Sequence, residues 1–567
     1  KANGWTELDN TALNKGFEPT PPEISKHKEQ SKAIIRDGSP LNKKILLGSI
    51  VFIVIGMASF KFSGSDVSID SPSIDREQAI SIAEEFLSTK NIDLAEGYEG
   101  YAMVATGYPG SGFIWEELGS DTFGNLLGSY VLGPRWKVRF AKFDGEVETR
   151  AREIIVSVDF EGNPIRFYNK FPENEAGVIL SQSDAKIIAD QALSDHFDLN
   201  QSMVSLVSAV ESQKPERLDW IFTYKEDKNV SYEGSQLESV ITVSGDQLAG
   251  FSQSIYIPEE WSRMKRDREG FSGMLAMLFS IPGGLFIGGL LLIRSFKMLM
   301  DNKLNLRKGA FFGAIIFVSA IVAFFNDSSF FMTLPTDQPI GNLMTTMYIS
   351  AMIGFLVIAL AQVLFFGGLG TMLKPTLNRS SISDSIVGGF IAALLATTVA
   401  MIAGSFQLDL NPNFPRITLA GLYYPIIGTF NIYGGFTVVA FSLFFAKTLF
   451  EFTDGYASTV KSNIYGVLLV MFVYGGTIEM QYTIGPSLMA ITLYSTLLFM
   501  VYKFIIKNNY MLIPFMVLFD KIIRTFSSNE LGAFNSYPNE ALFMVASYLV
   551  AIVVWVQLTK FFFDTDQ

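Results

Sequence analysis

The amino-acid sequence predicts a polytopic α-helical membrane protein with about ten transmembrane helices and a water-exposed α+β domain of two helix-plus-antiparallel-sheet repeats. Hydrophobic residues make up 49% of the 567-residue chain and charged residues only 17%, whereas ordinary soluble domains carry roughly 25% charge. The charges are concentrated in residues 1–44 and 61–271. Residues 272–567 are largely apolar, which marks a boundary between aqueous and lipid-embedded parts.

The N-terminal part of the chain is predicted to be a tail followed by an anchor. Residues 1–44 are polar and include the proline-rich stretch Pro19–Pro22, which favours a disordered cytoplasmic tail when it is isolated. The apolar stretch 45–60 is interpreted as a retained transmembrane anchor, because no small-residue cleavage pattern follows it.

Residues 61–271 are predicted to form a duplicated extracytoplasmic domain, with repeats at about 73–173 and 180–261. An amphipathic helix with a capped start is predicted over Asp75–Leu87, and a second helix of the same kind over Ser183–Leu193. Alternating apolar and polar residues follow each helix, as expected for half-buried antiparallel strands.

Strands and turns within the two repeats correspond. The strand Trp136–Phe140 matches Trp220–Tyr224, and the turn at Asp159–Pro164 matches the turn at Ser244–Gln247. We expect both tryptophans to pack in a core rather than to form a ligand platform. His196 follows the second helix and is interpreted as a surface or capping residue rather than a metal ligand.

Ten apolar stretches approach the length that a helix needs to cross a bilayer. Residues 272–567 are predicted to gather nine of them into one bundle. The predicted spans are 45–60, 273–293, 309–325, 342–368, 385–404, 417–447, 462–478, 484–506, 510–524 and 541–559.

Lys and Arg near the span ends predict the orientation of the chain. The tail ends in Lys43 and Lys44, and the 294–308 loop is rich in Lys and Arg, whereas the 326–341 loop has none. Alternation then places both termini in the cytoplasm and residues 61–271 on the opposite side. In this arrangement Lys521 and Arg524 lie on the side of the membrane away from the cytoplasm, where the alternation does not predict Lys or Arg.

The residue types that are missing exclude several classes of function. The chain has no cysteine, which excludes disulfides, thiolate metal sites and cysteine nucleophiles. Its two histidines, His27 and His196, both lie outside the predicted spans. The formal net charge is −12, and an acidic chain without basic stripes is not expected to bind nucleic acid.

The layout of an anchor, a duplicated helix-plus-sheet domain and a helical bundle resembles a subset of the CPBP intramembrane metalloproteases, also called the CAAX-protease or Abi family. That subset carries a PepSY-like domain. The resemblance covers residues 45–524 and is strongest at Trp136–Phe140, Asn169–Glu173 and Tyr256–Trp261.

The resemblance implies three catalytic motifs on membrane helices: Glu-Glu-x-x-x-Arg, Phe-x-x-x-His, and His-x-x-x-Asn or His-x-x-x-Asp. Glutamate and histidine in such motifs hold a metal or polarise a water. No histidine follows His196, so the histidine motifs are lost in any register. The corresponding positions are Ser442, Leu443 and Lys447 in the first motif, Phe472 and Gly476 in the second, and Met516 and Asp520 in the third.

Four other acidic residues in or near the spans are candidates for unusual catalysis: Glu451, Asp454, Glu479 and Asp520. The first two follow a helix end, where solvation at the interface explains them. Asp520 lies four residues before Arg524, a spacing that allows an ion pair on one helix. We therefore expect structural roles and predict no catalytic residue, metal or cofactor.

The expected function is that of a catalytically inactive scaffold or accessory subunit in a bacterial inner membrane complex. Its partners would be membrane or extracytoplasmic proteins and the lipid bilayer. PepSY-like domains are associated with restraining or binding peptidases, so the resemblance implies a protein partner. Small residues such as Gly283, Gly284, Gly288 and Gly289 suit close helix contacts, within the chain or with a partner.

Two alternatives remain open at this stage. A transporter or channel component would explain the glycine interruptions at Gly428–Gly435 and Gly475–Gly476, since broken helices often build transport sites. An active protease with non-standard residues is the weaker alternative because the histidines are absent.

Overall fold

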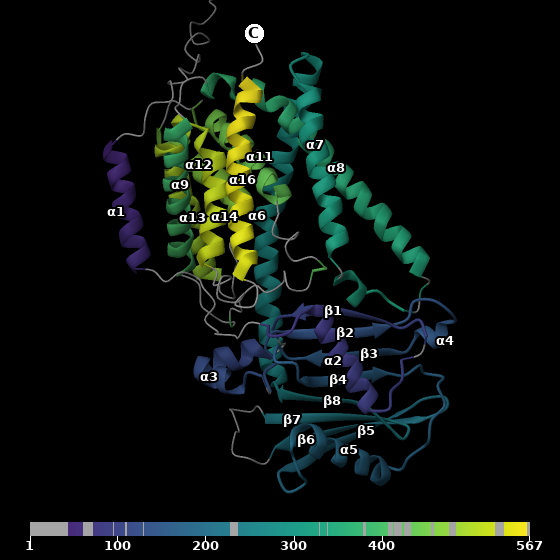
Figure 1. Cartoon of the computed structure of the whole chain (residues 1–567). Helices are drawn as coiled ribbons and strands as arrows, with labels where there is room; N and C mark the ends of the chain where they lie inside the picture. The colour runs from purple at the N-terminus through teal and green to yellow at the C-terminus, as the bar shows by residue number, and fades with distance from the viewer. Residues whose placement is uncertain are drawn as a thin grey trace, which may run out of the picture.

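A sheet domain and a helical bundle make up the described part of the chain (Figure 1). The computed structural model describes residues 43–59, 72–94, 96–107, 110–128, 130–226, 236–327, 329–336, 338, 340–377, 382–405, 412, 422–423, 432–454, 459–475, 484–527 and 538–563. The predicted tail, apart from its last two residues, and the motif position Gly476 lie outside these residues.

The sheet domain contains one eight-stranded antiparallel sheet in the order β1-β2-β3-β4-β8-β7-β6-β5. The strands are β1 (Glu99–Ala105), β2 (Arg135–Ala141), β3 (Glu153–Val158), β4 (Pro164–Lys170), β5 (Val204–Gln213), β6 (Leu218–Glu226), β7 (Gln236–Ser244) and β8 (Gln247–Tyr256). The short helices α3 (Ser111–Leu126) and α4 (Val147–Arg150) lie in its connections.

Both predicted helices of this domain form, and each has a side-chain cap. α2 (Arg76–Thr89) begins after Asp75, whose carboxylate accepts from the Gln78 backbone N–H while the Gln78 side chain accepts from the Asp75 backbone N–H. This reciprocal pair satisfies two backbone donors that the first turn leaves open. α5 (Gln182–Phe197) begins after Ser181, whose hydroxyl accepts from the Asp184 N–H.

The two halves of the sheet have the same order of elements. α2 precedes the meander β1–β4, and α5 precedes the meander β5–β8. The halves join between β4 and β8, where Phe167 pairs with Phe251 and Tyr168 with Gly250. The predicted turns also form, at the β3–β4 and β7–β8 connections.

One apolar core lies between the sheet and the two helices. Trp136 on β2 and Trp220 on β6 are both buried in it, as expected, together with Phe222. Burying side chains of this size stabilises the fold by about 2–3 kcal/mol each. His196 differs from the surface position expected for it, because its ring stacks on Phe251 with centroids 3.8 Å apart.

The second part of the chain is a bundle of long apolar helices (Figure 1). Its helices are α1 (Lys43–Ser59), α6 (Glu259–Met300), α7 (Leu306–Asn326), α8 (Ile340–Leu377), α9 (Ile382–Gly404), α11 (Ile432–Asp454), α12 (Thr459–Tyr474), α13 (Ile484–Phe504), α14 (Leu512–Ser527) and α16 (Pro538–Phe563).

A helix lies at each of the ten predicted spans, except that residues 417–431, apart from 422–423, are outside the described residues. Within the described residues, six helices are long and apolar enough to cross a membrane: α6, α7, α8, α9, α11 and α13. Thr459–Tyr474 and Met544–Gln557 are shorter apolar helices. These helices are those of a membrane protein.

Close glycine contacts hold parts of the bundle together. A Cβ at Gly389 on α9 would lie 2.4 Å from the Phe515 Cβ on α14, and a Cβ at Gly283 on α6 would lie 2.1 Å from the Phe472 carbonyl oxygen on α12. Both glycines therefore allow backbones to approach. Gly284 and Gly288, in contrast, face open space within the described residues.

A single helix joins the two parts. α6 has 42 residues, which corresponds to a length of about 63 Å, and it runs from the end of β8 into the bundle (Figure 1). The domain boundary predicted at residue 271 therefore falls inside this helix. Near its start, Trp261 packs with α3 residues and its Nε1 donates to the Glu117 carboxylate at 3.1 Å.

Candidate functional site

The motif positions of the bundle lie on three helices, α11, α12 and α14. Their surroundings show what each side chain does. Ser442 on α11 is buried and shares a hydrogen bond with the Tyr474 hydroxyl on α12. Its neighbour Leu443 is 1% exposed and belongs to the apolar core of the bundle. Neither position presents a carboxylate to a reaction centre.

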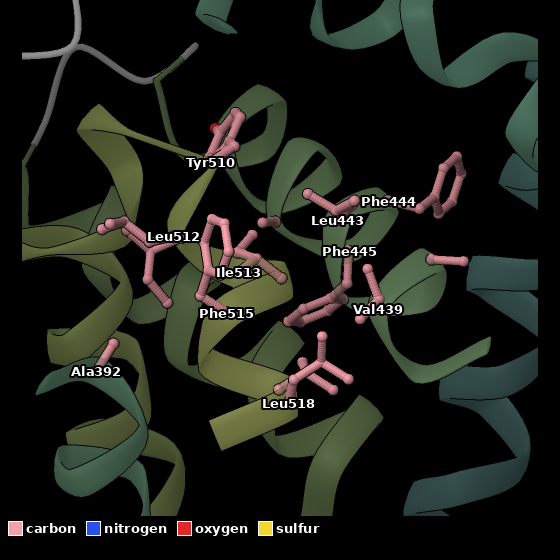
Figure 2. Close-up of a cluster of buried hydrophobic side chains, with 14 of the residues drawn as sticks. Ala392, Val439, Leu443, Phe444, Phe445, Tyr510, Leu512, Ile513, Phe515 and Leu518 are labelled. Carbon is pink, nitrogen blue, oxygen red and sulfur yellow. The ribbon is translucent and has the colours of Figure 1, made fainter. Parts of the chain in front are cut away.

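Figure 2 shows how apolar this centre is. Leu443 and Phe445 on α11 lie in one cluster with Phe515 and Leu518 on α14. Side chains from α9, including Ala392, belong to the same cluster. Among the described residues, the side chains around Leu443 therefore form a packed and mainly apolar core.

Lys447, the third position of the first motif, belongs to an ion-pair cluster between α6 and α11. Its Nζ lies 3.6 Å from the Glu451 carboxylate, which also forms an ion pair with Arg294 on α6. Arg294 Nη1 in addition donates to Thr448 Oγ1 at 3.1 Å. Glu451 therefore bridges two helices while it remains partly exposed, which agrees with the structural role expected for it.

Asp520 on α14 is held by two polar partners. Its Oδ2 lies 2.9 Å from Arg524 Nε, so the predicted ion pair on one helix forms. Its Oδ1 accepts from Thr397 Oγ1 on α9 at 3.4 Å. The carboxylate therefore links α14 to α9 and neutralises the charge of Arg524, one of the two cations on the unexpected side.

The two remaining described motif positions, Phe472 and Met516, take part in packing. Phe472 is 39% exposed and packs against Phe279 on α6, with ring centroids 5.9 Å apart. Met516 packs on the apolar core. The structure thus places Ser442, Lys447 and Asp520 in three separate polar contacts. Ser442 contacts Tyr474 on α12, Lys447 contacts Glu451 on its own helix, and Asp520 contacts Thr397 on α9.

Within the described residues, no three His, Cys, Asp or Glu side chains lie together in an arrangement that could hold a metal ion. The polar contacts described in the bundle involve serines, threonines, asparagines and ion pairs, but no histidine, because the sequence has none after His196. These contacts support helix packing.

A second polar site lies where the sheet domain meets the bundle, and the sequence did not indicate it. Arg139 on β2 is 3% exposed. Its guanidinium donates to the carbonyl oxygens of Phe331 and Leu334 at 2.6 and 2.7 Å, in the connection between α7 and α8. It also contacts the Glu153 carboxylate at 2.7 Å.

Further contacts extend this junction. The Arg150 guanidinium donates to the Gln338 carbonyl oxygen at 2.7 Å. The Tyr101 ring stacks on Phe331 with centroids 4.6 Å apart. Burial and a hydrogen bond to Glu99 raise the pKa of the Tyr101 hydroxyl, so it remains protonated at neutral pH.

Comparison of the chain with protein-family models, with curated proteins and with solved structures finds no match. Function must therefore be inferred from the site itself. The site has two features: its described motif positions take part in helix packing, and the sheet domain contacts the bundle through α6 and through the α7–α8 connection.

Proposed function

We propose that the chain is a catalytically inactive relative of the CPBP intramembrane proteases that acts as a scaffold or accessory subunit in a bacterial inner membrane complex. The observation that carries this proposal is the engagement of Asp520, the one acidic residue at a motif position. Its two oxygens contact Arg524 and Thr397. A carboxylate used in this way joins helices, which supports a structural role for it.

The rigid attachment of the sheet domain supports a binding role. α6 enters the bundle without interruption, and the α7–α8 connection contacts the sheet through Arg139 and Arg150. A protein bound to the sheet would therefore be held at a fixed position relative to the membrane helices. Holding partners in fixed positions is what a scaffold subunit requires.

The finer features of the predicted arrangement belong to the same proposal. We propose that all ten helices span the membrane, that both termini are cytoplasmic and that the two sheet halves arose by duplication. Two observations support the orientation. The C-terminal end of α16 lies at the end of the bundle away from the sheet domain (Figure 1), and the α7–α8 connection, which has no Lys or Arg, lies against the sheet.

The transporter alternative depended on interruptions at Gly428–Gly435 and Gly475–Gly476. Residues 428–431 and Gly476 lie outside the described residues, whereas residues 432–435 belong to the first turn of α11. Gly475 packs near Ile491 and Phe279, where a Cβ would be 3.2 Å from the Ile491 side chain. This contact is one of helix packing.

Purification of the chain from its native membranes in mild detergent tests the proposal. Every co-purifying polypeptide is identified by mass spectrometry, and the same purification is done with residues 1–42 deleted. We expect a stoichiometric partner, and its loss from the deletion variant would place the contact on the tail. Recovery of the chain alone in several mild detergents would refute a scaffold role.

A further inference from the structure

The sheet has one face that α2 and α5 do not cover. Both helices pack on the face that carries Trp136 and Phe222. Because side chains alternate along a strand, the residues next to these point to the other face, which we call the outer face. On the half of the sheet nearest the bundle, the outer face carries Arg135, Lys137 and Arg139 of β2 and Arg166 of β4.

Cations of this face are aligned across strands. In the sheet register, Lys137 on β2 pairs with Ser157 on β3, and Ser157 pairs with Arg166 on β4. Lys137 and Arg166 therefore lie on one line across the sheet, and their Cα atoms are about 10 Å apart because neighbouring strands are about 4.8 Å apart.

The cations of the outer face differ in how they are neutralised. Arg139 is paired with Glu153, and Lys170 also lies 3.4 Å from that carboxylate. Lys137 and Arg166 form no ion pair or hydrogen bond with any described residue. Glu153 thus forms ion pairs with two cations, Arg139 and Lys170, whereas Lys137 and Arg166 have no ion-pair partner among the described residues.

The surroundings of Lys137 are positive. Half-burial lowers the pKa of its ammonium group, and the nearby charges of Arg135, Arg139 and Arg166 lower it further, while the Glu153 carboxylate offsets them only in part. Each of these causes disfavours the charged lysine, so an anion placed among the four side chains would relieve the repulsion. Arg166 and Tyr168 on β4 are exposed and leave this position accessible.

We propose that the outer face of β2–β4 binds an acidic segment of a partner polypeptide, with carboxylates contacting Lys137 and Arg166. The inference depends on the proposed scaffold function and names the chemistry of its partner. In an extended segment, side chains two or four residues apart lie on the same side and are separated by about 7 or 13 Å, so flexible glutamate side chains at either spacing reach both cations.

The position of the cations favours a polypeptide over a lipid headgroup. β1 is the strand nearest the bundle, and the sheet extends away from the bundle in the order β2, β3 and β4 (Figure 1). Arg166 on β4 is three strands from β1, or about 14 Å. A ligand that contacts both Lys137 and Arg166 must therefore reach along the sheet away from the helix ends, as a polypeptide does.

The test measures binding of a short fluorescent oligoglutamate peptide to the full-length chain in neutral-lipid nanodiscs, by anisotropy at low salt. We expect binding that weakens as salt is raised, about threefold weaker binding for Lys137→Gln or Arg166→Gln, and about tenfold weaker binding for the double variant. Lys225→Gln is the matched control, because Lys225 lies on β6 opposite Glu238.

Several outcomes would overturn the inference. One is that an oligoglutamine peptide of the same length binds equally well, and another is that the double variant binds the oligoglutamate peptide unchanged. A third is that Lys137 and Arg166 bind phosphatidylglycerol vesicles but do not bind the peptide. If the chain forms a dimer and the double variant abolishes that dimer, the outer face binds a second copy of the chain, which would also overturn the inference. A partner found by co-purification, together with no peptide binding, would remove only this inference and leave the scaffold function standing.

Discussion

Arg268 on α6 and Glu116 on α3 form a two-pronged ion pair, in which Nη1–Oε1 is 2.6 Å and Nη2–Oε2 is 2.9 Å. Both side chains are mostly buried, with 22% and 16% exposed. Because α3 packs on the sheet and α6 continues into the bundle, this pair fixes the direction in which the long helix leaves the domain.

Arg268→Gln is expected to lower the free energy of unfolding of the sheet domain by about 2 kcal/mol, because a parallel pair of charge-assisted hydrogen bonds is lost. Denaturant unfolding followed by tryptophan fluorescence measures it. The matched control is Arg263→Gln, whose side chain is 67% exposed and pairs with Glu259; it should change stability by less than about 0.5 kcal/mol. Equal effects of the two changes would contradict the role of Arg268.

Gly283→Ala and Gly284→Ala test the packing of α6 on α12. A Cβ at Gly283 meets the Phe472 carbonyl oxygen at 2.1 Å, whereas a Cβ at Gly284 meets nothing within 4 Å among the described residues. We expect Gly283→Ala to destabilise the bundle by about 1–3 kcal/mol and Gly284→Ala to leave it unchanged or slightly more stable. The measurement is thermal unfolding in detergent. A larger loss of stability in Gly284→Ala than in Gly283→Ala would show that α6 packs on α12 with another face.

Arg139→Met is expected to loosen the junction between the sheet and the α7–α8 connection. The change removes the donors to the Phe331 and Leu334 carbonyl oxygens and takes one cation from Glu153. Breaking a buried pair of this kind costs about 3 kcal/mol. Hydrogen exchange of residues 329–336 should rise in Arg139→Met but not in Lys137→Met, and unchanged exchange would contradict the contact.

His196 predicts a dependence of stability on pH. Burial first, and then the charge of Lys90, lower its pKa from 6.5 to about 4 in the folded chain. The unfolded chain therefore binds a proton more readily, so the free energy of unfolding falls as pH drops from about 6.5 towards 4. His196→Gln should weaken this fall relative to the wild type, as measured by thermal unfolding across that range. Parallel curves for the two proteins would show that the histidine is solvated.

Much of the architecture could be predicted from local sequence patterns. The capping pair Asp75 and Gln78 marks the start of α2, and the apolar stretches mark the helices of the bundle. Trp136 and Trp220 were also correctly expected to lie in the core. These features depend on residues close together in the chain or on a simple alternation, which a sequence displays directly.

The contacts that fix the two parts together could not be predicted in this way. Arg139 donates to a backbone carbonyl 192 residues away, and any residue supplies such a carbonyl. α3 was also missed, because its helical path is interrupted at Gly119, where φ is +82°. Among the motif positions, only the pairing of Asp520 with Arg524 could be predicted, because it depends on spacing within one helix.

The most direct test of the central claim is native mass spectrometry of the chain released from its membrane, for the wild type and for the variant Ser442→Ala with Asp520→Asn. We predict the same partner at the same stoichiometry in both, and no cleavage of peptide substrates by either. A wild-type chain that leaves the membrane without a partner, or that cleaves peptides while the variant does not, would contradict the claim that this bundle acts by binding.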